Sequence, residues 1–346
     1  MVESIPTESE QFQLCVIEGD GIGHEVIPAA VDVLAATGFN FNVIQANAGW
    51  DTFLAQGAAL PEQTLTVAGE SNAVLFGAVS SPSYKVTGYA SPIVEMRRRL
   101  ELFANLRPTH SWPIPNSRPD IDLLIIRENT EGLYVHRETS DGKTAVAERI
   151  ITYQASERIA HIACQWAMRR NRKLTIVHKA NVLTETCGLF RQTVLKVTAD
   201  YPEISVDEKL VDATALMLVT QPEKFDVIVT TNMFGDILSD EAAGLVGGLG
   251  LAPSANIGSK TAPALFEPVH GSAPDIAGKG IANPIAAFLA VVMLLEHIDE
   301  TVRASAIRQA VMTSLENGPH TPDLGGNART IDVTNEITNM VKSILR

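Results

Sequence analysis

Cysteine is scarce in this sequence: Cys15, Cys164 and Cys187 are widely spaced, and no CxxC pair occurs. This spacing argues against a disulfide framework or a structural zinc site and is typical of a protein of the reducing cytoplasm. Long apolar runs are also absent, because the longest, residues 285–295, is too short to span a bilayer and predicts a core helix. The residues up to Gln11 are polar and acidic, without the apolar core of a signal peptide, and predict a loose tail.

Basic residues are in the minority, with 27 Lys and Arg against 40 Asp and Glu and a formal net charge of −13. A charge of this sign argues against nucleic acid and anionic membranes as partners. Arginines nevertheless gather at residues 97–99, with Arg107 nearby, which indicates either an anion site or a solvated helix face. The 346 residues, of which 45% are hydrophobic, can bury a large core and suggest two domains.

Strand-like segments alternate with helical patterns along the chain, which predicts an α/β protein with a largely parallel sheet. Residues 134–148 are polar and predict a projecting hairpin. The proline-rich residues 106–119 predict a crossing between two lobes, and the glycine-rich residues 244–254 predict the return. Strands are expected at residues 13–17, 41–44, 73–76, 123–127, 174–178 and 226–230, and helices at 24–37, 61–68, 154–170, 184–198 and 285–295.

Residues 225–240, FDVIVTTNMFGDILSD, join a buried strand to a helix with two carboxylates. The β-branched run at 227–229 predicts the strand. Asp236 and Asp240 are four residues apart and therefore share one helix face, where a hard cation would remove their mutual repulsion. The stretch alone fits equally well a cap formed by Asp236 and a carboxylate that favours the positive end of the helix, so both interpretations stay open.

The loop at residues 19–23, GDGIG, follows a strand and opens a helix, yet it is not a dinucleotide fingerprint. That fingerprint needs a third glycine where this chain has His24, and an acidic residue about 20 positions on, whereas Asp32 lies inside the helix. The loop is therefore either a tight strand-to-helix turn or an anion site at a helix N-terminus.

Six motifs in one order resemble the β-decarboxylating dehydrogenases of 2-hydroxy acids, the isocitrate and isopropylmalate dehydrogenase family. They are GDGIGHEVIPA at 19–29, LRP at 106–108, RENTEGLY at 127–134, HKANVL at 178–183, the aspartate stretch at 225–240, and EPVHGSAPDIAGKGIANP at 267–284. The resemblance covers nearly the whole chain and implies a two-lobed α/β/α fold with a central sheet and a non-Rossmann cofactor site. It also implies a large cofactor-binding domain of residues 1–108 and 255–346, and a small domain of residues 109–254 with the dimer interface.

The resemblance implies a metal site of three aspartates. Asp236 and Asp240 match two of them, and Asp212 in LVDAT matches the one that the neighbouring subunit contributes. Ligation by oxygen alone suits Mg²⁺ or Mn²⁺, which would act as a Lewis acid on the substrate. The protein is therefore expected to be a homodimer with shared active sites, and whether two dimers form a tetramer stays open.

The substrate and catalytic residues follow from the same resemblance. Arg97, Arg107 and Arg127 match arginines that clamp the carboxylates of the substrate, which guanidinium groups bind bidentately. Lys179 matches the general base for the 2-hydroxyl group, contributed across the subunit boundary, with a pKa that the nearby metal would depress. Tyr134 matches the acid that protonates the enolate carbon.

The cofactor loop predicts NAD⁺. Asp275 falls where the family contacts the adenosine ribose, and a carboxylate there accepts hydrogen bonds from ribose hydroxyls and repels a 2′-phosphate. NADP-using relatives place Lys-Tyr where this chain has Asp275-Ile276. Ser81 and Asn181 are expected to face the substrate as well. The full set of implied cofactor contacts is Val79, Ser80, Ser81, Asn181, His270, Gly271, Ser272, Ala273, Pro274, Asp275 and Asn283.

Substrate choice is expected to depend on residues 89–97, YASPIVEMR, which resemble the fungal homoisocitrate dehydrogenases of lysine biosynthesis in their SPIV element. Thermophilic homoisocitrate enzymes that also accept isocitrate carry Arg where this chain has Val94. Isopropylmalate enzymes have more leucine on this helix face, although a valine would tolerate an isopropyl group. We therefore predict NAD-dependent oxidative decarboxylation of homoisocitrate to 2-oxoadipate and CO₂, in the α-aminoadipate route, with isocitrate and 3-isopropylmalate as alternative substrates. A non-catalytic regulatory subunit is disfavoured because every catalytic position is filled.

Overall fold

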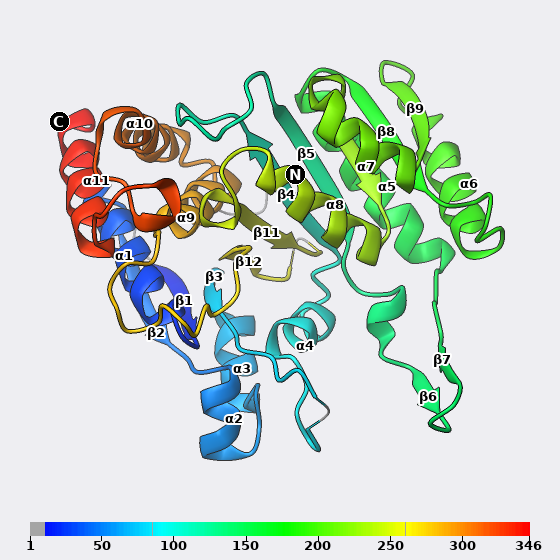
Figure 1. Ribbon diagram of the computed structural model, residues 1–346, viewed down its shortest axis with the longest axis horizontal. Helices are drawn as coiled ribbons and strands as arrows, with labels where there is room; N and C mark the ends of the chain where they lie inside the picture. Colours follow the sequence, from blue (N-terminus) through cyan, green and yellow to red (C-terminus); the bar gives the residue numbers. More distant parts are fainter. Residues whose placement is uncertain (1–10, 85, 260) are drawn as a thin grey trace. The chain divides into compact units, whose positions relative to one another are not determined.

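The computed structural model of the protein describes residues 11–84, 86–259 and 261–346. The tail predicted for the start of the chain therefore lies outside the described residues, apart from Gln11. Helices and strands alternate through the described ranges, as expected, and the fold is mixed α/β (Figure 1). No helix in these ranges is both long and apolar enough to cross a membrane.

The chain divides into two compact units. Unit one contains the residues up to 96 together with 249–255 and 259–346, and unit two contains residues 97–248 and 256–258. The chain thus returns to unit one within the glycine-rich stretch that predicted a return.

The strands of unit one follow the order β2-β1-β3-β12-β11, with β1 parallel to β2 and β3, and β3 parallel to β12. The last two residues of β11 belong to unit two. Helix α1 packs on α9 and α11, α10 also packs on both of these helices, and α1 and α9 pack on the sheet. Its elements are β1 (Phe12–Gly19), α1 (Gly23–Ala36), β2 (Phe41–Gln45), α2 (Trp50–Gln56), α3 (Glu62–Glu70), β3 (Ala73–Ala78), η3 (Leu249–Leu251), β11 (Pro253–Ile257), β12 (Ala264–Pro268), α9 (Ile285–His297), α10 (Thr301–Asn317), η4 (Pro322–Leu324) and α11 (Thr330–Ile344).

The core of unit one is built from its most apolar segments. All six residues of β3, AVLFGA, are buried. The helix predicted at residues 285–295 is confirmed as α9, and it is apolar on almost every side because neighbouring elements surround it.

Unit two contains a mixed sheet in the order β4-β5-β10-β8-β9, in which β4 and β5 are antiparallel and the other neighbours are parallel. The predicted hairpin is confirmed as the exposed antiparallel pair of β6 and β7 (Figure 1). Its elements are β4 (Ala104–His110), β5 (Asp122–Glu128), η1 (Leu133–Val135), β6 (Glu138–Ser140), β7 (Ala145–Ala147), α5 (Tyr153–Arg169), β8 (Lys173–His178), α6 (Thr186–Thr198), β9 (Ser205–Leu210), α7 (Val211–Thr220), η2 (Pro222–Lys224), β10 (Val227–Thr230) and α8 (Asn232–Gly244).

The proline-rich residues 106–119 were predicted to cross between two lobes. Those residues form part of β4 and the connection from β4 to β5, and both strands lie in unit two. A proline is compatible with a strand position at which no N–H donor is required, so prolines did not mark the change of unit. The change instead falls inside α4 (Pro92–Arg99). The domain boundaries expected after residues 108 and 254 stay a prediction.

Glycine at position 235 allows α8 to approach β5 closely. A Cβ atom at Gly235 would lie 2.7 Å from Cβ and 2.8 Å from Cγ of Arg127. At the other end of the same helix, a Cβ atom at Gly244 would meet no atom within 4 Å.

We predict that Gly235→Ala lowers the free energy of unfolding by roughly 1–3 kcal/mol, because the extra methyl overpacks against Arg127. Gly244→Ala is the matched control and should be neutral or stabilising by up to about 1 kcal/mol, since alanine favours a helix over glycine. Urea unfolding of both variants measures the difference. Equal stabilities for the two variants would contradict the close approach of α8 and β5.

Candidate active site

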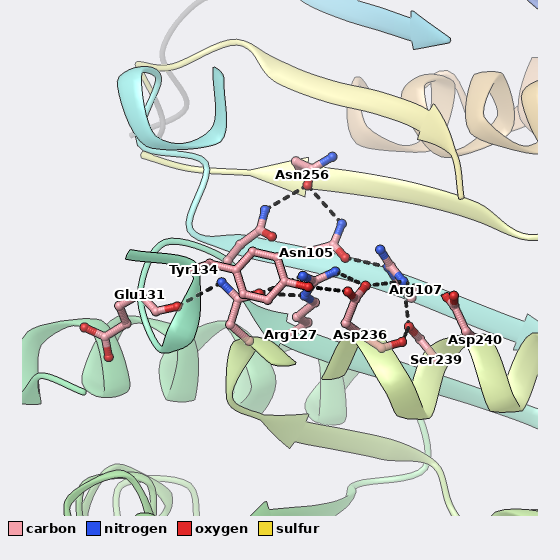
Figure 2. A network of polar contacts seen from close by, with 11 residues as sticks. Asn105, Arg107, Arg127, Glu131, Tyr134, Asp236, Ser239, Asp240 and Asn256 are labelled. Carbon is pink, nitrogen blue, oxygen red and sulfur yellow. Dashed lines mark hydrogen bonds and ion pairs between the residues drawn. The ribbon is translucent and has the colours of Figure 1, made fainter. Parts of the chain in front are cut away.

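A cluster of charged side chains lies in unit two, where β4, β5, η1 and α8 meet (Figure 2). The antiparallel register of β4 and β5 places Asn105 opposite Arg127 and Arg107 opposite Ile125. Since β10 is parallel to β5 and Thr230 pairs with Arg127, the helix that follows β10 begins beside that arginine. The pairing of β4, β5 and β10 therefore brings Arg107 and Arg127 close to residues of α8 that lie more than 100 positions further along the chain.

Arg127 is almost fully buried, with 1% of its surface exposed. One edge of its guanidinium, Nε and Nη2, donates to Asn232 Oδ1 at 2.9 and 2.7 Å. Its Nη1 forms an ion pair with Asp236. Burial, followed by the charges of Arg107 and Arg97, lowers the pKa of Arg127 to about 10, so the group stays charged at neutral pH.

Arg107 reaches the same helix face from β4. Its Nη1 donates to Ser239 Oγ at 2.7 Å and lies 3.1 and 3.2 Å from carboxylate oxygens of Asp240 and Asp236. The side chain of Arg107 is 9% exposed, whereas those of Asp236 and Asp240 are 33% and 50% exposed. The carboxylates are therefore the solvent-facing side of the cluster, where a ligand could reach them.

The two aspartates differ in their protonation behaviour. Burial raises the pKa of Asp236, but Arg127 and Arg107 outweigh it and hold the pKa below its usual value. The pKa of Asp240 is raised by burial, which Arg107 only partly opposes, and the charge of Asp236 adds to the rise. Two carboxylates on one helix face that differ in this way are typical of a functional site.

Tyr134 joins the cluster from η1. Its hydroxyl donates a short hydrogen bond to Asp236 Oδ2, and its ring lies 5.0 Å from Cζ of Arg127. Burial raises the pKa of Tyr134; the charge of Arg127 opposes this rise, and the hydrogen bond to Asp236 adds to it, so the phenol keeps its proton at neutral pH. Arg97, with 7% exposed, acts on this group through its charge.

Lys179 and Asp212 form a second group in unit two. Lys179 follows β8, Asp212 lies in the first turn of α7, and the two side chains form an ion pair. Their exposed fractions are 24% and 64%. Within the described ranges neither forms a hydrogen bond or ion pair with Asp236 or Asp240, and no set of three His, Cys, Asp or Glu residues is arranged to hold a metal ion. Asn181, two residues beyond Lys179, is exposed.

In unit one, the segments expected to contact the cofactor follow neighbouring parallel strands. Residues 79–81 follow β3, and residues 270–275 follow β12, which is paired with β3. Ser80 Oγ donates to Ser272 Oγ at 2.7 Å, which ties the two loops together. Loops at the carboxyl ends of adjacent parallel strands are the usual place for a ligand in α/β sheets.

The glycine-rich loop at residues 19–23 is a structural turn. Gly19 has a φ of +78°, and a Cβ atom there would lie 1.9 Å from the Ala78 carbonyl oxygen. The carboxylate of Asp20, 2% exposed, accepts the N–H groups of Trp50, Asp51 and Ser80 at 2.8–3.0 Å. This carboxylate therefore caps the start of α2. At the start of α1, the N–H groups of Gly23 and His24 donate to the carbonyl oxygens of Asp20 and Gly21 at 3.0 and 3.3 Å, which favours the turn over the anion site.

The loop after β12 has features that fit a nucleotide. His270 Nε2 is buried and makes no hydrogen bond in the described residues, and burial lowers the pKa of this imidazole. Ala273 has a φ of +40°, a costly conformation for alanine that is often found at ligand sites. Asn283 Nδ2 donates to Asp323 Oδ2 at 2.9 Å, while Gly271, Pro274 and Asp275 are exposed.

Three contributors to the charged cluster escaped the sequence analysis: Asn105, Asn232 and Ser239. Asn232 is the first residue of α8 and is 1% exposed, and Asn105 is fully buried. A polar residue between a buried strand and a buried helix indicates a buried hydrogen bond. The sequence does not say which residue is its partner, because that depends on which strand lies beside the helix.

Comparisons with known proteins agree on the family. The chain matches the family described as isocitrate/isopropylmalate dehydrogenase over residues 13–341. It is 54% identical to an isocitrate/homoisocitrate dehydrogenase of Thermus thermophilus, over 96% of this chain and 99% of that protein. It is 50% identical to a 3-isopropylmalate dehydrogenase of Methanothermobacter thermautotrophicus, over 95% and 98%. The crystal structure of isocitrate dehydrogenase from Methylococcus capsulatus is similar with a TM-score of 0.91 and 42% identity, over 96% of this chain and 99% of that one.

Glu131 connects the cluster to the start of α5. Its carboxylate accepts the backbone N–H and the hydroxyl of Thr152, the N-cap residue of α5, at 2.9–3.1 Å. Its carbonyl oxygen accepts a hydrogen bond from Asn232 Nδ2 at 3.0 Å. Burial, with a smaller contribution from Glu128, raises the pKa of Glu131 from 4.5 to about 7.

We predict a pH-dependent effect of Glu131→Gln. Between pH 4.5 and about 7 the unfolded chain has lost this proton and the folded chain retains it, so Glu131 makes wild-type stability fall as pH rises. The variant lacks this loss, although glutamine holds Thr152 less well. In urea unfolding, the free energy of unfolding of the variant should therefore rise relative to that of wild type between pH 5 and pH 8. A Glu203→Gln control at an exposed site should show no such change. A pH-independent difference would contradict the raised pKa.

Proposed function

Because this chain belongs to the isocitrate/isopropylmalate dehydrogenase family, we propose that it is an NAD-dependent homoisocitrate dehydrogenase. Membership makes it a β-decarboxylating dehydrogenase that acts on a hydroxy acid. The reaction proposed is the oxidative decarboxylation of homoisocitrate to 2-oxoadipate and CO₂. The observation that supports the reaction best is the cluster in which Arg107, Arg127, Tyr134, Asp236 and Asp240 meet (Figure 2).

The arginines would bind the acid. Arg107 and Arg127 bring guanidinium groups to one face of α8 from neighbouring strands, and the charge of Arg97 acts on the same place. Charge-assisted hydrogen bonds to carboxylates are strong and directional, so such groups fix the orientation of a polycarboxylic acid. A substrate with three carboxylates suits a site with this number of arginines.

The partly exposed carboxylates of Asp236 and Asp240 fit a hard divalent cation such as Mg²⁺ or Mn²⁺ in ligand type, and Asp212 of a neighbouring subunit would add a third carboxylate. When bound, such a cation supplies Lewis-acid stabilisation of negative charge on the substrate oxygen. Tyr134 keeps its proton at neutral pH and is suited to donate it to carbon after CO₂ leaves. Lys179 is the proposed acceptor of the hydroxyl proton.

A homodimer would bring these groups together. Lys179 and Asp212 pair with each other at the surface of unit two and form no hydrogen bond or ion pair with Asp236 or Asp240 in the described ranges. Helices α7 and α8 carry exposed apolar side chains, with Leu216 65%, Val219 49% and Ile237 59% exposed. A second copy that covers these side chains supports the proposal that Lys179 and Asp212 complete a neighbouring site.

The substrate assignment depends on Val94, and the cofactor assignment on Asp275. An arginine in place of Val94 would provide a counter-charge for the shorter isocitrate side arm, and this chain lacks it. An exposed carboxylate at Asp275 would repel the 2′-phosphate of NADP⁺. The second candidate substrate is 3-isopropylmalate, since valine accommodates an isopropyl group and the 3-isopropylmalate dehydrogenase of Methanothermobacter thermautotrophicus is 50% identical to this chain.

The purified protein should reduce NAD⁺ with homoisocitrate at the highest kcat/KM among homoisocitrate, isocitrate and 3-isopropylmalate, and should prefer NAD⁺ over NADP⁺. Because the proposed chemistry needs a divalent cation, chelation should abolish turnover and added Mg²⁺ or Mn²⁺ should restore it. The formation of reduced cofactor, followed by absorbance, measures all combinations. A higher kcat/KM for 3-isopropylmalate would replace the substrate, and turnover unaffected by chelation would contradict the metal role of the aspartates.

Shared sites can be tested with two inactive variants. A heterodimer of Lys179→Met with Asp236→Asn would contain one fully wild-type site and should regain about half the activity of the wild-type dimer. A heterodimer of Lys179→Met with Asp212→Asn is the control and should stay inactive, since both residues come from the same side of the boundary. Differently tagged subunits, co-expressed and purified as heterodimers, provide the measurement. Equal activity in both heterodimers would contradict the shared arrangement.

A further inference from the structure

Two buried asparagines, Asn105 (labelled in Figure 2) and Asn232, hold the inner edges of the arginines in the cluster. Asn232 Oδ1 accepts hydrogen bonds from both Nε and Nη2 of Arg127, at 2.9 and 2.7 Å. Asn105 Oδ1 accepts a hydrogen bond from Nε of Arg107 at 2.7 Å. The asparagines are 1% and 0% exposed. Each guanidinium is therefore held from within the protein, and its Nη1 group points to the aspartates.

Both amides are anchored at their other end as well. Asn232 Nδ2 donates to the carbonyl oxygen of Glu131 at 3.0 Å, and Asn105 Nδ2 donates to Asn256 Oδ1 at 2.9 Å. An amide that is bound through its oxygen and its nitrogen cannot rotate without losing buried hydrogen bonds, which is costly. The orientation of each guanidinium is thereby fixed.

The amide of Asn232 is neutral, so it can orient Arg127 without neutralising the positive charge of that side chain. Arg127 is buried, and the charges of Arg107 and Arg97 also disfavour its protonated form. A carboxylate is the partner that a buried guanidinium ordinarily requires. Among the described residues, Asp236 is the one carboxylate in ion-pair distance of Arg127, and it is a third exposed. At its inner edge Arg127 is held by an amide, which directs it without cancelling its charge.

We propose that Asn232 is a positioning residue, which orients the Arg127 guanidinium through a neutral amide and so preserves its positive charge for a carboxylate of the substrate. Asn105 acts on Arg107 in the same way. The inference rests on the proposed function, in which these arginines bind the acid. Because a carboxylate contact is made in both the ground state and the transition state, the effect should fall on KM more than on kcat.

Two substitutions separate orientation from charge. Asn232→Asp keeps an acceptor for Arg127 and adds a negative charge, and we expect KM for the hydroxy acid to rise about tenfold or more with kcat within about threefold. Asn232→Ser removes the tether without adding charge, and we expect a smaller rise of KM, about threefold to tenfold. Asn335→Asp adds the same charge at an exposed position of α11 and should leave KM unchanged.

Malate binding provides a readout that does not need turnover. Malate carries the hydroxy-diacid half that the candidate substrates share, and calorimetric titration in the presence of Mg²⁺ gives its Kd. The rise in Kd should follow the rise in KM, and it should be larger for Asn232→Asp than for Asn232→Ser at both low and high salt, because ions screen a buried charge only weakly. Thermal unfolding shows whether each variant is folded.

A folded Asn232→Asp with unchanged KM and unchanged malate Kd would overturn the proposal, and so would a loss of kcat without a change in KM. Should Asn232→Asp not fold, Asn232→Ser and Asn105→Ser decide by the same measurements. If wild type turns over none of the three acids, the proposed function fails, whereas the comparison of malate Kd between wild type and variants still tests the role of Asn232.

Discussion

The buried charge of Arg127 is the constraint on which the arrangement of unit two depends. A guanidinium with 1% exposure is tolerated only where hydrogen bonds and an opposite charge compensate for the water it has lost. Asn232 and Asp236 supply these from successive turns of α8. Gly235 lies between them and lets the helix approach closely enough for both contacts. The start of α8 is therefore adapted to one side chain of β5.

The same constraint gives the aspartates their different properties. Asp236 lies next to two arginines, which hold its pKa down despite burial, and Tyr134 donates to its second oxygen. Asp240 lies one turn further along α8, is half exposed, and has a raised pKa. Asp236, which forms ion pairs with both arginines, is thus one helix turn away from Asp240, which is more exposed and easier for a ligand to reach. An excess of buried positive charge, presented through half-exposed carboxylates, suits a ligand that brings negative charge and a cation together.

Local patterns predicted many elements of the fold, and long-range pairing explains what they missed. The β-branched run of β10 and the apolar α9 were predicted because their own residues determine their burial. Strand β9, SVDEKL, was missed because an edge strand needs little apolar surface. The motif resemblance identified Arg107, Arg127 and Asp236, which the structure brings together. It could not identify Asn105 or Asn232, because their role depends on the antiparallel register of β4 and β5 and on the neighbourhood of β10.

The residues proposed for one reaction form two separate groups in unit two, and this separation has a consequence for how the activity would be controlled. Arg107, Arg127 and Asp236 form a continuous network within one chain, and the proposed function assigns the binding of the acid to it. Lys179 and Asp212 satisfy each other's charge at the surface and contribute nothing to that network within the described ranges. If a second subunit brings its Lys179 and Asp212 to the arginine network, substrate binding needs one subunit, whereas proton abstraction needs two. A lone subunit would then bind the acid without oxidising it, because the binding charges are intramolecular while the base arrives only with the partner.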